Sequence, residues 1–132
     1  MPAHLEQRGA HPHVALVTID RPEAANSLDP ETLRDLAGHW QRINADETIR
    51  AAILTGAGDR VYCAGMDMRA TIPISQALAR GERVDPLEFE GLRAVSHATL
   101  VKTRLRVTLI AARNGHARAG GFDLMLASEM RF

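Results

Sequence analysis

The chain has 132 residues, which is enough for one domain or for part of one. Sixteen basic and sixteen acidic residues cancel, so no excess charge favours a nucleic acid or an anionic membrane as a partner. Hydrophobic residues make up 45% of the chain and aromatic residues only 4%, so aliphatic side chains and methionine must fill the core. The one cysteine, Cys63, excludes an internal disulfide and is typical of a reducing compartment.

The N-terminal stretch carries none of the patterns that direct a protein to a membrane. The sequence MPAHLEQRGAHPHV lacks the apolar centre of a secretory signal, and we expect residues 1–13 to form a flexible tail. No run of about 18 apolar residues occurs in the chain, so we expect no membrane span. The sequence therefore predicts a soluble, cytoplasmic protein.

Two strands and a helix are predicted in the first part of the chain. Val14–Ile19 is short and β-branched, as is typical of a strand. Asp29 and Pro30 predict a helix start, with Asp29 as the N-cap and Pro30 at the first helical position. A second strand, Ala51–Thr55, is apolar throughout, so we expect it to be buried on both faces. The helix between the strands has one apolar face, formed by Leu33, Leu36, Ala37, Trp40 and Ile43.

The middle of the chain is less regular. A glycine-rich loop follows the second strand and leads into a short helix near Met66. Residues 71–86 contain two prolines and a glycine, which predicts a mobile insertion with at most one helical turn. Leu87–Leu100 has apolar residues at helical spacing, although Gly91 disfavours a helix. Arg106–Ala112 then forms a third predicted strand.

The last residues begin a helix at Gly120 and a further strand at Met130–Phe132. Strands that alternate with helices in this order indicate an α/β domain whose strands are mainly parallel. A strand that begins on the last three residues has no room to finish. We therefore interpret the chain as the N-terminal part of a longer protein or as a truncated gene product.

Four familiar kinds of site are weakly supported by the sequence. The sequence GAGDRV after the second strand resembles a dinucleotide-binding loop, but Val61 replaces the third glycine. The six histidines share no ligand spacing, so we expect them to be solvated or packed and predict no metal site. Cys63 is either a nucleophile or, as is usual for a lone buried thiol, a small hydrophobic residue. No serine lies in a G-x-S-x-G elbow.

Two glycine loops, Cys63–Asp67 and Ala117–Asp123, follow predicted strands and precede predicted helices. At such a place backbone N–H groups are unpaired, and the helix dipole adds partial positive charge. Two such loops on neighbouring parallel strands would direct their amides to one point and form an oxyanion hole. The alternative is that the glycines only permit tight turns. The residues themselves leave both interpretations open.

Three blocks of the sequence resemble the enoyl-CoA hydratase/isomerase (crotonase) superfamily. The first is VALVTIDRPEAANSLDPETLRDL, the second is IRAAILTGAGDRVYCAGMDM, and the third is LIAARNGHARAGGFDLMLASEMRF. They occur in the family's order and spacing and cover most of Val14–Phe132. The resemblance implies a crotonase-like ββα superhelix (spiral) that is truncated before the C-terminal helices, with 14–132 as the incomplete core.

The resemblance also implies the site. In crotonases two backbone N–H groups bind the thioester carbonyl of an acyl-CoA, and the matching positions here are Met66 and Gly120. Such a site needs no metal or redox cofactor, because the thioester itself accepts the electrons. The residues that match substrate-binding positions are Ala64, Gly65, Met66, Asp67, Met68, Arg69 and Gly120.

Asp123 matches the first of the two glutamates that hydratases use as general acid and base. Aspartate is one methylene shorter than glutamate, and a misplacement near 1 Å can cost about 10² in rate. Alternatively, Asp123 is a first-turn acid that complements the helix dipole. Three other positions depart from the family: Ala119 replaces the first glycine of its triple, Thr108 stands where a proline is common, and Arg113 stands where an apolar residue is usual. The second acid of the hydratase pair would lie beyond Phe132.

The sequence thus favours acyl-CoA thioester chemistry through an enolate, by hydration of a 2-enoyl-CoA or by double-bond isomerisation. The alternative is a non-catalytic, truncated crotonase remnant that binds CoA or pairs with a fuller subunit. A serine protease of the Clp type is a distant third, because its nucleophile motif is absent. For a full-length chain the resemblance implies a homo-oligomer, a trimer or a dimer of trimers. The truncated chain, with apolar surface left uncovered, is expected to self-associate and to have little hydratase activity.

Overall fold

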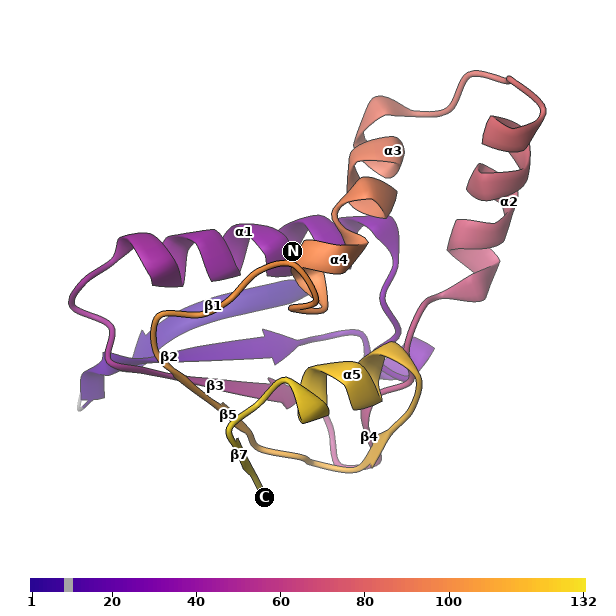
Figure 1. Cartoon of the computed structure of the whole chain (residues 1–132). Helices are drawn as coiled ribbons and strands as arrows, with labels where there is room; N and C mark the ends of the chain where they lie inside the picture. The colour runs from indigo at the N-terminus through magenta and orange to yellow at the C-terminus, as the bar shows by residue number, and fades with distance from the viewer. Residues whose placement is uncertain (9–10) are drawn as a thin grey trace.

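The computed structural model of the protein describes residues 1–8 and 11–132 and contains a five-stranded mixed sheet. The strands lie in the order β1-β2-β3-β5-β7 (Figure 1). The first pair is antiparallel and the other three pairs are parallel, as the alternation of strands and helices predicted. The strands of this sheet are β1 (Ala3–Arg8), β2 (His11–Ile19), β3 (Ala51–Gly56), β5 (Thr108–Ala111) and β7 (Met130–Arg131).

The N-terminal residues do not form the expected flexible tail. Strand β1 pairs with β2 along its length, with Ala3 opposite Ile19. The Nε2 atom of His39 lies 2.7 Å from the carbonyl oxygen of Ala3, and the Ala3 amide donates to Asp35 over 3.3 Å. The prediction of a tail is therefore wrong for Ala3–Arg8 and for the residues of 1–13 that begin β2; Gly9 and Ala10 lie outside the described residues. The strand depends on partners distant in sequence, which the local pattern does not reveal.

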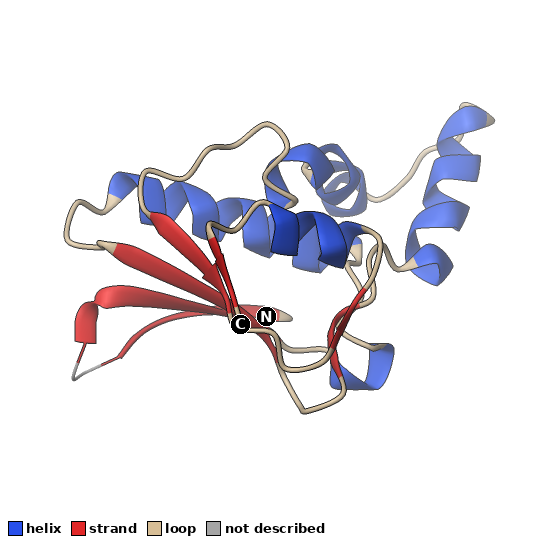
Figure 2. Cartoon of the chain, turned by 60° about the horizontal axis from the view of Figure 1, so that its bottom comes forward, coloured by secondary structure: helices blue, strands red, loops and turns tan. Residues whose placement is uncertain are grey.

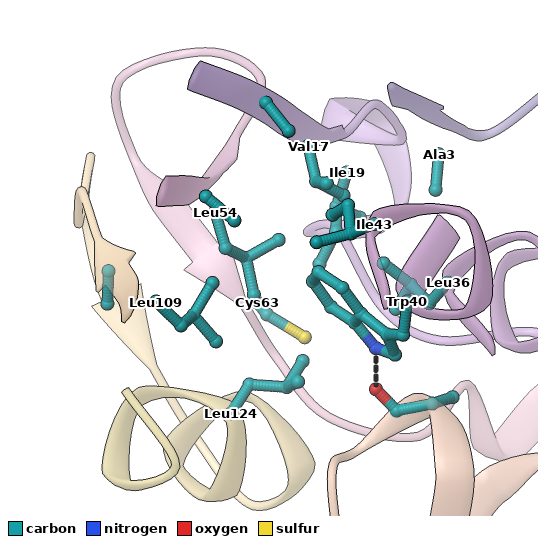
Figure 3. Close-up of a cluster of buried hydrophobic side chains, with 14 of the residues drawn as sticks. Ala3, Val17, Ile19, Leu36, Trp40, Ile43, Leu54, Cys63, Leu109 and Leu124 are labelled. Carbon is teal, nitrogen blue, oxygen red and sulfur yellow. Dashed lines mark hydrogen bonds between the residues drawn. The ribbon is translucent and has the colours of Figure 1, made fainter. Parts of the chain in front are cut away.

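Helix α1 (Pro30–Ala45) begins where the sequence predicted it. The side chain of Asp29 accepts a hydrogen bond from the Thr32 amide at 2.8 Å and caps the helix. The indole N–H of Trp40 donates to the carbonyl oxygen of Ala98 over 2.8 Å (Figure 3). The predicted apolar face of α1 is confirmed: its side chains are buried at Leu33, Leu36, Trp40 and Ile43.

The sheet is covered on one face only. Figure 2 shows the α-helices on one side of the strands. On β3, Ala52 and Leu54 point to this side and are buried, whereas Ile53 on the opposite face is half-buried. The prediction that this strand is buried on both faces is therefore wrong within the described chain. Side chains from the sheet, α1 and α5 meet in the core between them (Figure 3).

The predicted mobile insertion contains a regular helix. Helix α2 (Met68–Ala79) has twelve residues and includes Pro73, so the prediction of a single turn at most is wrong, and the helix begins two residues after Met66. Pro73 removes one N–H hydrogen bond and crowds the carbonyl of Arg69, which disfavours this helix without breaking it, and Asp67 caps the helix at its start. Helices α2 and α3 (Pro86–Arg93) project from the body of the molecule (Figure 1).

The predicted helix at Leu87–Leu100 is confirmed in two pieces, α3 and α4 (Val95–Ala98). Gly91, which disfavours a helix on its own, lies against the backbone of Pro30 at the start of α1. A Cβ atom there would overlap the Pro30 carbonyl group, so the close crossing of the two helices requires this glycine.

The remaining elements lie at the carboxyl ends of β3 and β5. A short second sheet joins β4 (Val61–Cys63) to β6 (His116–Ala117) in parallel, and α5 (Gly120–Leu126) follows it. The predicted start of α5 at Gly120 and the predicted strand at the end of the chain are confirmed. Within residues 1–8 and 11–132, no helix combines the length and apolar character needed to cross a membrane.

Candidate active site

The first glycine loop connects β4 to α2 and is bonded to the segment that precedes α1. The Leu28 amide donates to the Gly65 carbonyl over 2.8 Å, and the Asp67 amide donates to the Leu28 carbonyl over 2.9 Å. Leu28 and Met66 thus form a parallel bridge. Because amides alternate in direction along extended backbone, the Met66 N–H points away from this bridge. Gly65 has φ +96°, a left-handed conformation that favours glycine.

Charged groups hold the same loop from the other side. The guanidinium of Arg21 lies 3.0 Å from a carboxylate oxygen of Asp67 and 3.3 Å from one of Asp29. Partial burial would raise the pKa of Asp67, but the hydrogen bonds from Arg21 and from the Ala70 amide, with the charge of Arg21, hold that pKa below its usual value. The carboxylate is therefore ionised and fixed in place at neutral pH.

The second glycine loop connects β6 to α5 and lies against the first. The Arg118 amide donates to the Cys63 carbonyl over 3.0 Å. A Cβ atom at Gly121 would overlap the same carbonyl oxygen, so the two backbones are in direct contact. Ala119 has φ 46° and ψ −122°, which is a strained conformation for a residue with a side chain.

The two loops meet next to the predicted oxyanion donors. A Cβ atom at Gly65 would lie 3.2 Å from the nitrogen of Gly120 and 2.8 Å from the Cβ of Ala119. The structure thus brings Gly120 next to the residue that precedes Met66. Across the described ranges, neither the Met66 amide nor the Gly120 amide donates a hydrogen bond to a protein acceptor. Their convergence on a single oxygen atom stays a prediction.

A hollow of about 690 Å³ opens beside the first loop, between the segment that precedes α1 and the start of α2. It contains Met66, Asp67, Met68 and Arg69, four of the predicted substrate-binding residues. Ala64 and Gly65 lie behind it in the loop, and Gly120 lies on the other side of Gly65. Another hollow of about 690 Å³ lies beside residues 113–116, and one of about 580 Å³ lies between β1 and the end of α1; neither contains a predicted site residue. The hollow beside the first loop is the candidate site because it contains four of these residues.

Asp123 lies in the first turn of α5, three residues after Gly120. Its side chain is exposed, and its amide donates to the Ala119 carbonyl over 3.0 Å as part of the helix. The position suits both a proton-transfer group beside the loops and an acid that complements the helix dipole. Its role stays a prediction.

Cys63 is a core residue. Its thiol is buried and points towards Leu124 (Figure 3). Desolvation raises the pKa of Cys63 to about 11, against a weaker opposing hydrogen bond from the Gly65 amide. A thiol in this environment is protonated and unreactive at neutral pH, which favours the small-hydrophobe interpretation. In the part of the chain that the structure describes, no three His, Cys, Asp or Glu side chains gather as a metal site would need.

Two asparagines without any signal in the sequence fix the GAGDRV loop. The Asn26 side-chain amide donates to the carbonyls of Ala57 and Val61, over 2.9 and 2.7 Å. The Asn114 amide donates to the Gly58 carbonyl over 2.9 Å. The loop's carbonyls are thus bound by side chains from distant segments, and its glycines serve a tight turn.

Comparison with known proteins gives a consistent picture. The family model described as enoyl-CoA hydratase/isomerase matches residues 9–132. The (E)-benzylidenesuccinyl-CoA hydratase of Thauera aromatica is 40% identical over 131 residues, which are 99% of this chain and 46% of that protein. The carnitinyl-CoA dehydratase of Proteus mirabilis is 38% identical over 128 residues, 96% of this chain and 43% of that protein.

Solved structures show the same likeness in fold. The crystal structure of an enoyl-CoA hydratase from Bacillus anthracis superimposes with a TM-score of 0.79 at 29% identity, over 99% of this chain and 46% of that one. A carnitinyl-CoA hydratase from Mycobacterium avium gives 0.75 at 34% identity, over 98% of this chain and 45% of that one. The predicted crotonase fold is confirmed, and the chain spans slightly less than half the length of these relatives.

Proposed function

The chain belongs to the enoyl-CoA hydratase/isomerase family, and from that premise we propose that it acts on an acyl-CoA thioester by way of an enolate. The observation that carries the proposal is the pair of neighbouring backbone amides, Met66 and Gly120, that have no acceptor among the described residues. Two N–H donors of this kind suit an oxygen atom that gains negative charge during a reaction.

Hydration is the reaction that we favour, because the relatives named above are hydratases and a dehydratase of CoA thioesters. Water adds its hydroxyl to the β-carbon of a 2-enoyl-CoA, and the electron pair of the double bond moves towards the thioester carbonyl. The resulting enolate oxygen accepts the two N–H groups, and a proton then returns to the α-carbon. Removal of one such donor costs about 10²–10³ in rate.

Asp123 is our candidate for the proton transfers. It follows Gly120 by three residues on α5, and its exposed carboxylate can position a water molecule and accept its proton. Double-bond isomerisation needs the same enolate and the same group, since a proton leaves one carbon and returns to another. The chemistry calls for no metal or redox cofactor, because the thioester carbonyl itself accepts the electron pair.

The remaining parts of the proposal concern the surroundings of the protein. We assign acyl-CoA as its partner, with no nucleic acid or membrane, and the cytoplasm as its location. The full-length protein is proposed to be a homo-oligomer built from trimers. A second candidate function is a non-catalytic chain that binds CoA or pairs with a fuller subunit. The exposure of the Asp123 carboxylate favours this second candidate, because catalysis needs a more confined group.

A variant that deletes one donor tests the proposal. Met66→Pro removes the N–H group and should abolish binding of acetoacetyl-CoA, whose enolate resembles the proposed anion. Met66→Ala keeps the N–H group, so its affinity for acetoacetyl-CoA should lie within about threefold of the wild-type affinity. The N–H donor contributes far more to binding than the methionine side chain does. Binding is followed by the enolate absorbance of the ligand, and turnover by loss of the crotonyl-CoA absorbance. Equal binding by both variants would contradict the oxyanion role, and binding without turnover would favour the second candidate.

A further inference from the structure

Arg21 lies at the end of β2 with its guanidinium directed between two loops. One terminal nitrogen contacts both Asp67 and Asp29, over 3.0 and 3.3 Å. The other donates to the carbonyl oxygen of Ser27 over 2.6 Å. The arginine side chain is only 16% exposed, and the two carboxylates are 15% and 20% exposed. Arg21 does not line the candidate hollow, so it has no part among the proposed substrate contacts.

Each of the two aspartates that Arg21 contacts also caps a helix. The second oxygen of Asp29 accepts from the Thr32 amide over 2.8 Å at the start of α1. The second oxygen of Asp67 accepts from the Ala70 amide over 3.3 Å at the start of α2. One guanidinium therefore ties together the N-caps of two helices that are distant in sequence.

The two helices differ in how firmly the rest of the protein holds them. Helix α1 buries a full apolar face against the sheet, whereas α2 buries only Thr71 and Ile74. Packing alone therefore fixes the start of α1 much better than the start of α2. Because Arg21 contacts both carboxylates, it holds Asp67 in place relative to Asp29, whose own position the packing of α1 fixes.

Asp67 is the residue directly after Met66. Its amide is bonded to the Leu28 carbonyl, and its side chain is held by Arg21. The Met66 N–H belongs to the Gly65–Met66 peptide, whose carbonyl accepts from the Leu28 amide, so backbone bonds to Leu28 anchor Met66 on both sides. Arg21 supports the second of these anchors by holding the Asp67 side chain. A displacement of Asp67 moves Met66 relative to its first anchor and redirects its N–H group, and a misplacement near 1 Å costs about 10² in rate.

We propose that Arg21 is a positioning residue: by joining the N-caps of α1 and α2 it sets the direction of the Met66 amide without touching the substrate. The inference rests on the proposed function of that amide as an oxyanion donor. A purely structural role would weaken the whole fold and all ligands alike. A positioning role weakens only ligands that place an anionic oxygen at the amide.

The experiment compares two ligands on the 132-residue chain. Acetoacetyl-CoA presents an enolate to the amides, whereas CoA has no carbonyl to place there. Arg21→Gln should weaken acetoacetyl-CoA binding by about ten- to a hundredfold and change CoA binding by less than about threefold. Arg21→Lys should restore part of the loss, because it keeps the charge but not the forked geometry. The matched control is Arg80→Gln, which breaks the exposed pair with Glu82 (59% and 52% exposed) and should change neither affinity.

The outcomes separate the inference from the proposed function. If the wild type binds acetoacetyl-CoA no more tightly than CoA, the proposed function fails. If the wild type discriminates and Arg21→Gln discriminates equally well, the positioning role fails. Equal loss for both ligands would indicate a structural role and would also overturn the inference.

Further variants keep the test decisive if Arg21→Gln does not fold. Asp67→Asn retains the capping oxygen and removes the charge, so it should reproduce the loss of acetoacetyl-CoA binding. The double variant Arg21→Lys with Asp67→Asn should bind acetoacetyl-CoA as tightly as Asp67→Asn alone, because both substitutions disrupt the same contact between Arg21 and Asp67. Additive losses in this cycle would contradict the inference. Hydrogen exchange gives a readout without any ligand. The backbone amide of residue 67 should exchange faster in Asp67→Asn than in the wild type, while the exchange rates of the α1 amides stay unchanged.

Discussion

The two glycine loops lie against each other, but they are held by different forces. The first loop, Ala64–Asp67, is bonded to Leu28 on both sides of Met66 and paired through Asp67 with Arg21. The second loop, at Ala119–Gly121, has no ion pair in the described residues and is fixed by contact with the first. An ion pair and hydrogen bonds hold the first loop, whereas backbone contact and the hydrogen bond from the Arg118 amide to the Cys63 carbonyl hold the second.

The difference shows that the two loops depend on each other unequally. The first loop is anchored to segments that precede it in the chain, so it can keep its shape without the second. The second loop rests on the Cys63 carbonyl and on Gly65, so any displacement of the first loop moves it as well. Changes at the contact between the loops should therefore have larger effects than changes within either one.

The largest effect is expected where the two backbones touch. Gly121→Ala places a methyl group on the Cys63 carbonyl oxygen, which must separate the loops. Overpacking of this kind costs about 1–3 kcal/mol and occasionally more, and we expect about 3 kcal/mol because the obstacle is backbone. Urea unfolding followed by circular dichroism measures the change in the free energy of unfolding.

Gly38→Ala is the matched control for this substitution. Gly38 lies within α1, and nothing lies within 4 Å of the position that its Cβ would take. The change should raise the free energy of unfolding by about 0.5–1 kcal/mol, because alanine favours a helix. A Gly121→Ala protein as stable as the wild type would refute the close contact of the loops.

A smaller effect, of opposite sign, is expected within the second loop. Ala119 has φ 46° and ψ −122°, a conformation that costs a residue with a side chain about 1–3 kcal/mol. Ala119→Gly relieves this strain and loses about 0.5–1 kcal/mol through the greater freedom of the unfolded chain. The net gain in the free energy of unfolding should be about 1 kcal/mol.

The control for Ala119→Gly is Ala117→Gly, two residues earlier in β6. Ala117 has no positive φ, so it has no such strain to relieve. This second change should therefore lower the free energy of unfolding by about 0.5–1 kcal/mol. Destabilisation by both glycines would mean that Ala119 is not strained in solution.

The smallest effect is a pH dependence confined to the first loop. The pKa of Asp67 is lowered in the folded protein from its ordinary value of 3.8, so the unfolded chain binds the proton more tightly. Its contribution to stability is therefore fully present above about pH 4 and is lost as the pH falls through the folded pKa. Asp67→Asn lacks this contribution at every pH.

Urea unfolding of the wild type and Asp67→Asn between pH 7 and pH 3 measures the effect. The difference in their free energies of unfolding should be constant near neutral pH and should shrink as the pH falls below 3.8, the ordinary pKa of an aspartate. The same comparison with Ala119→Gly in place of the aspartate variant should show no such convergence. A difference that grows on acidification would contradict the ion pair with Arg21.

The sequence predicted those parts of the fold that local patterns determine. The cap at Asp29 and the apolar face of α1 depend on neighbouring residues, and both are as expected. Strand β1 was mistaken for a tail because its partners, the strand β2 and the side chain of His39, lie outside any local pattern. Helix α2 was mistaken for a mobile segment because Pro73 disfavours a helix, although the helix continues through it.

The same distinction applies to the candidate site. The two glycine loops were found because bare backbone before a helix is visible in the sequence. Arg21, Asn26 and Asn114 were not found, because each acts on loops more than one element away. An arginine after a strand has no signature until the fold shows that two helix caps lie within its reach.

The parallel order of β2, β3 and β5 has a kinetic consequence. Each of these pairings brings together two strands that are far apart in the sequence. The chain between them must lose entropy before the hydrogen bonds form, so folding is slow compared with that of a helical bundle. Met66 lies within the segment that the last of these pairings closes and Gly120 lies beyond it, so the two amides become neighbours only after β3 and β5 have paired. A ligand that both amides hold will therefore bind the native state alone and stabilise it in proportion to the logarithm of the ligand concentration. The thermal midpoint of this chain, measured with increasing acyl-CoA, thus reports on the assembly of the last part of the fold.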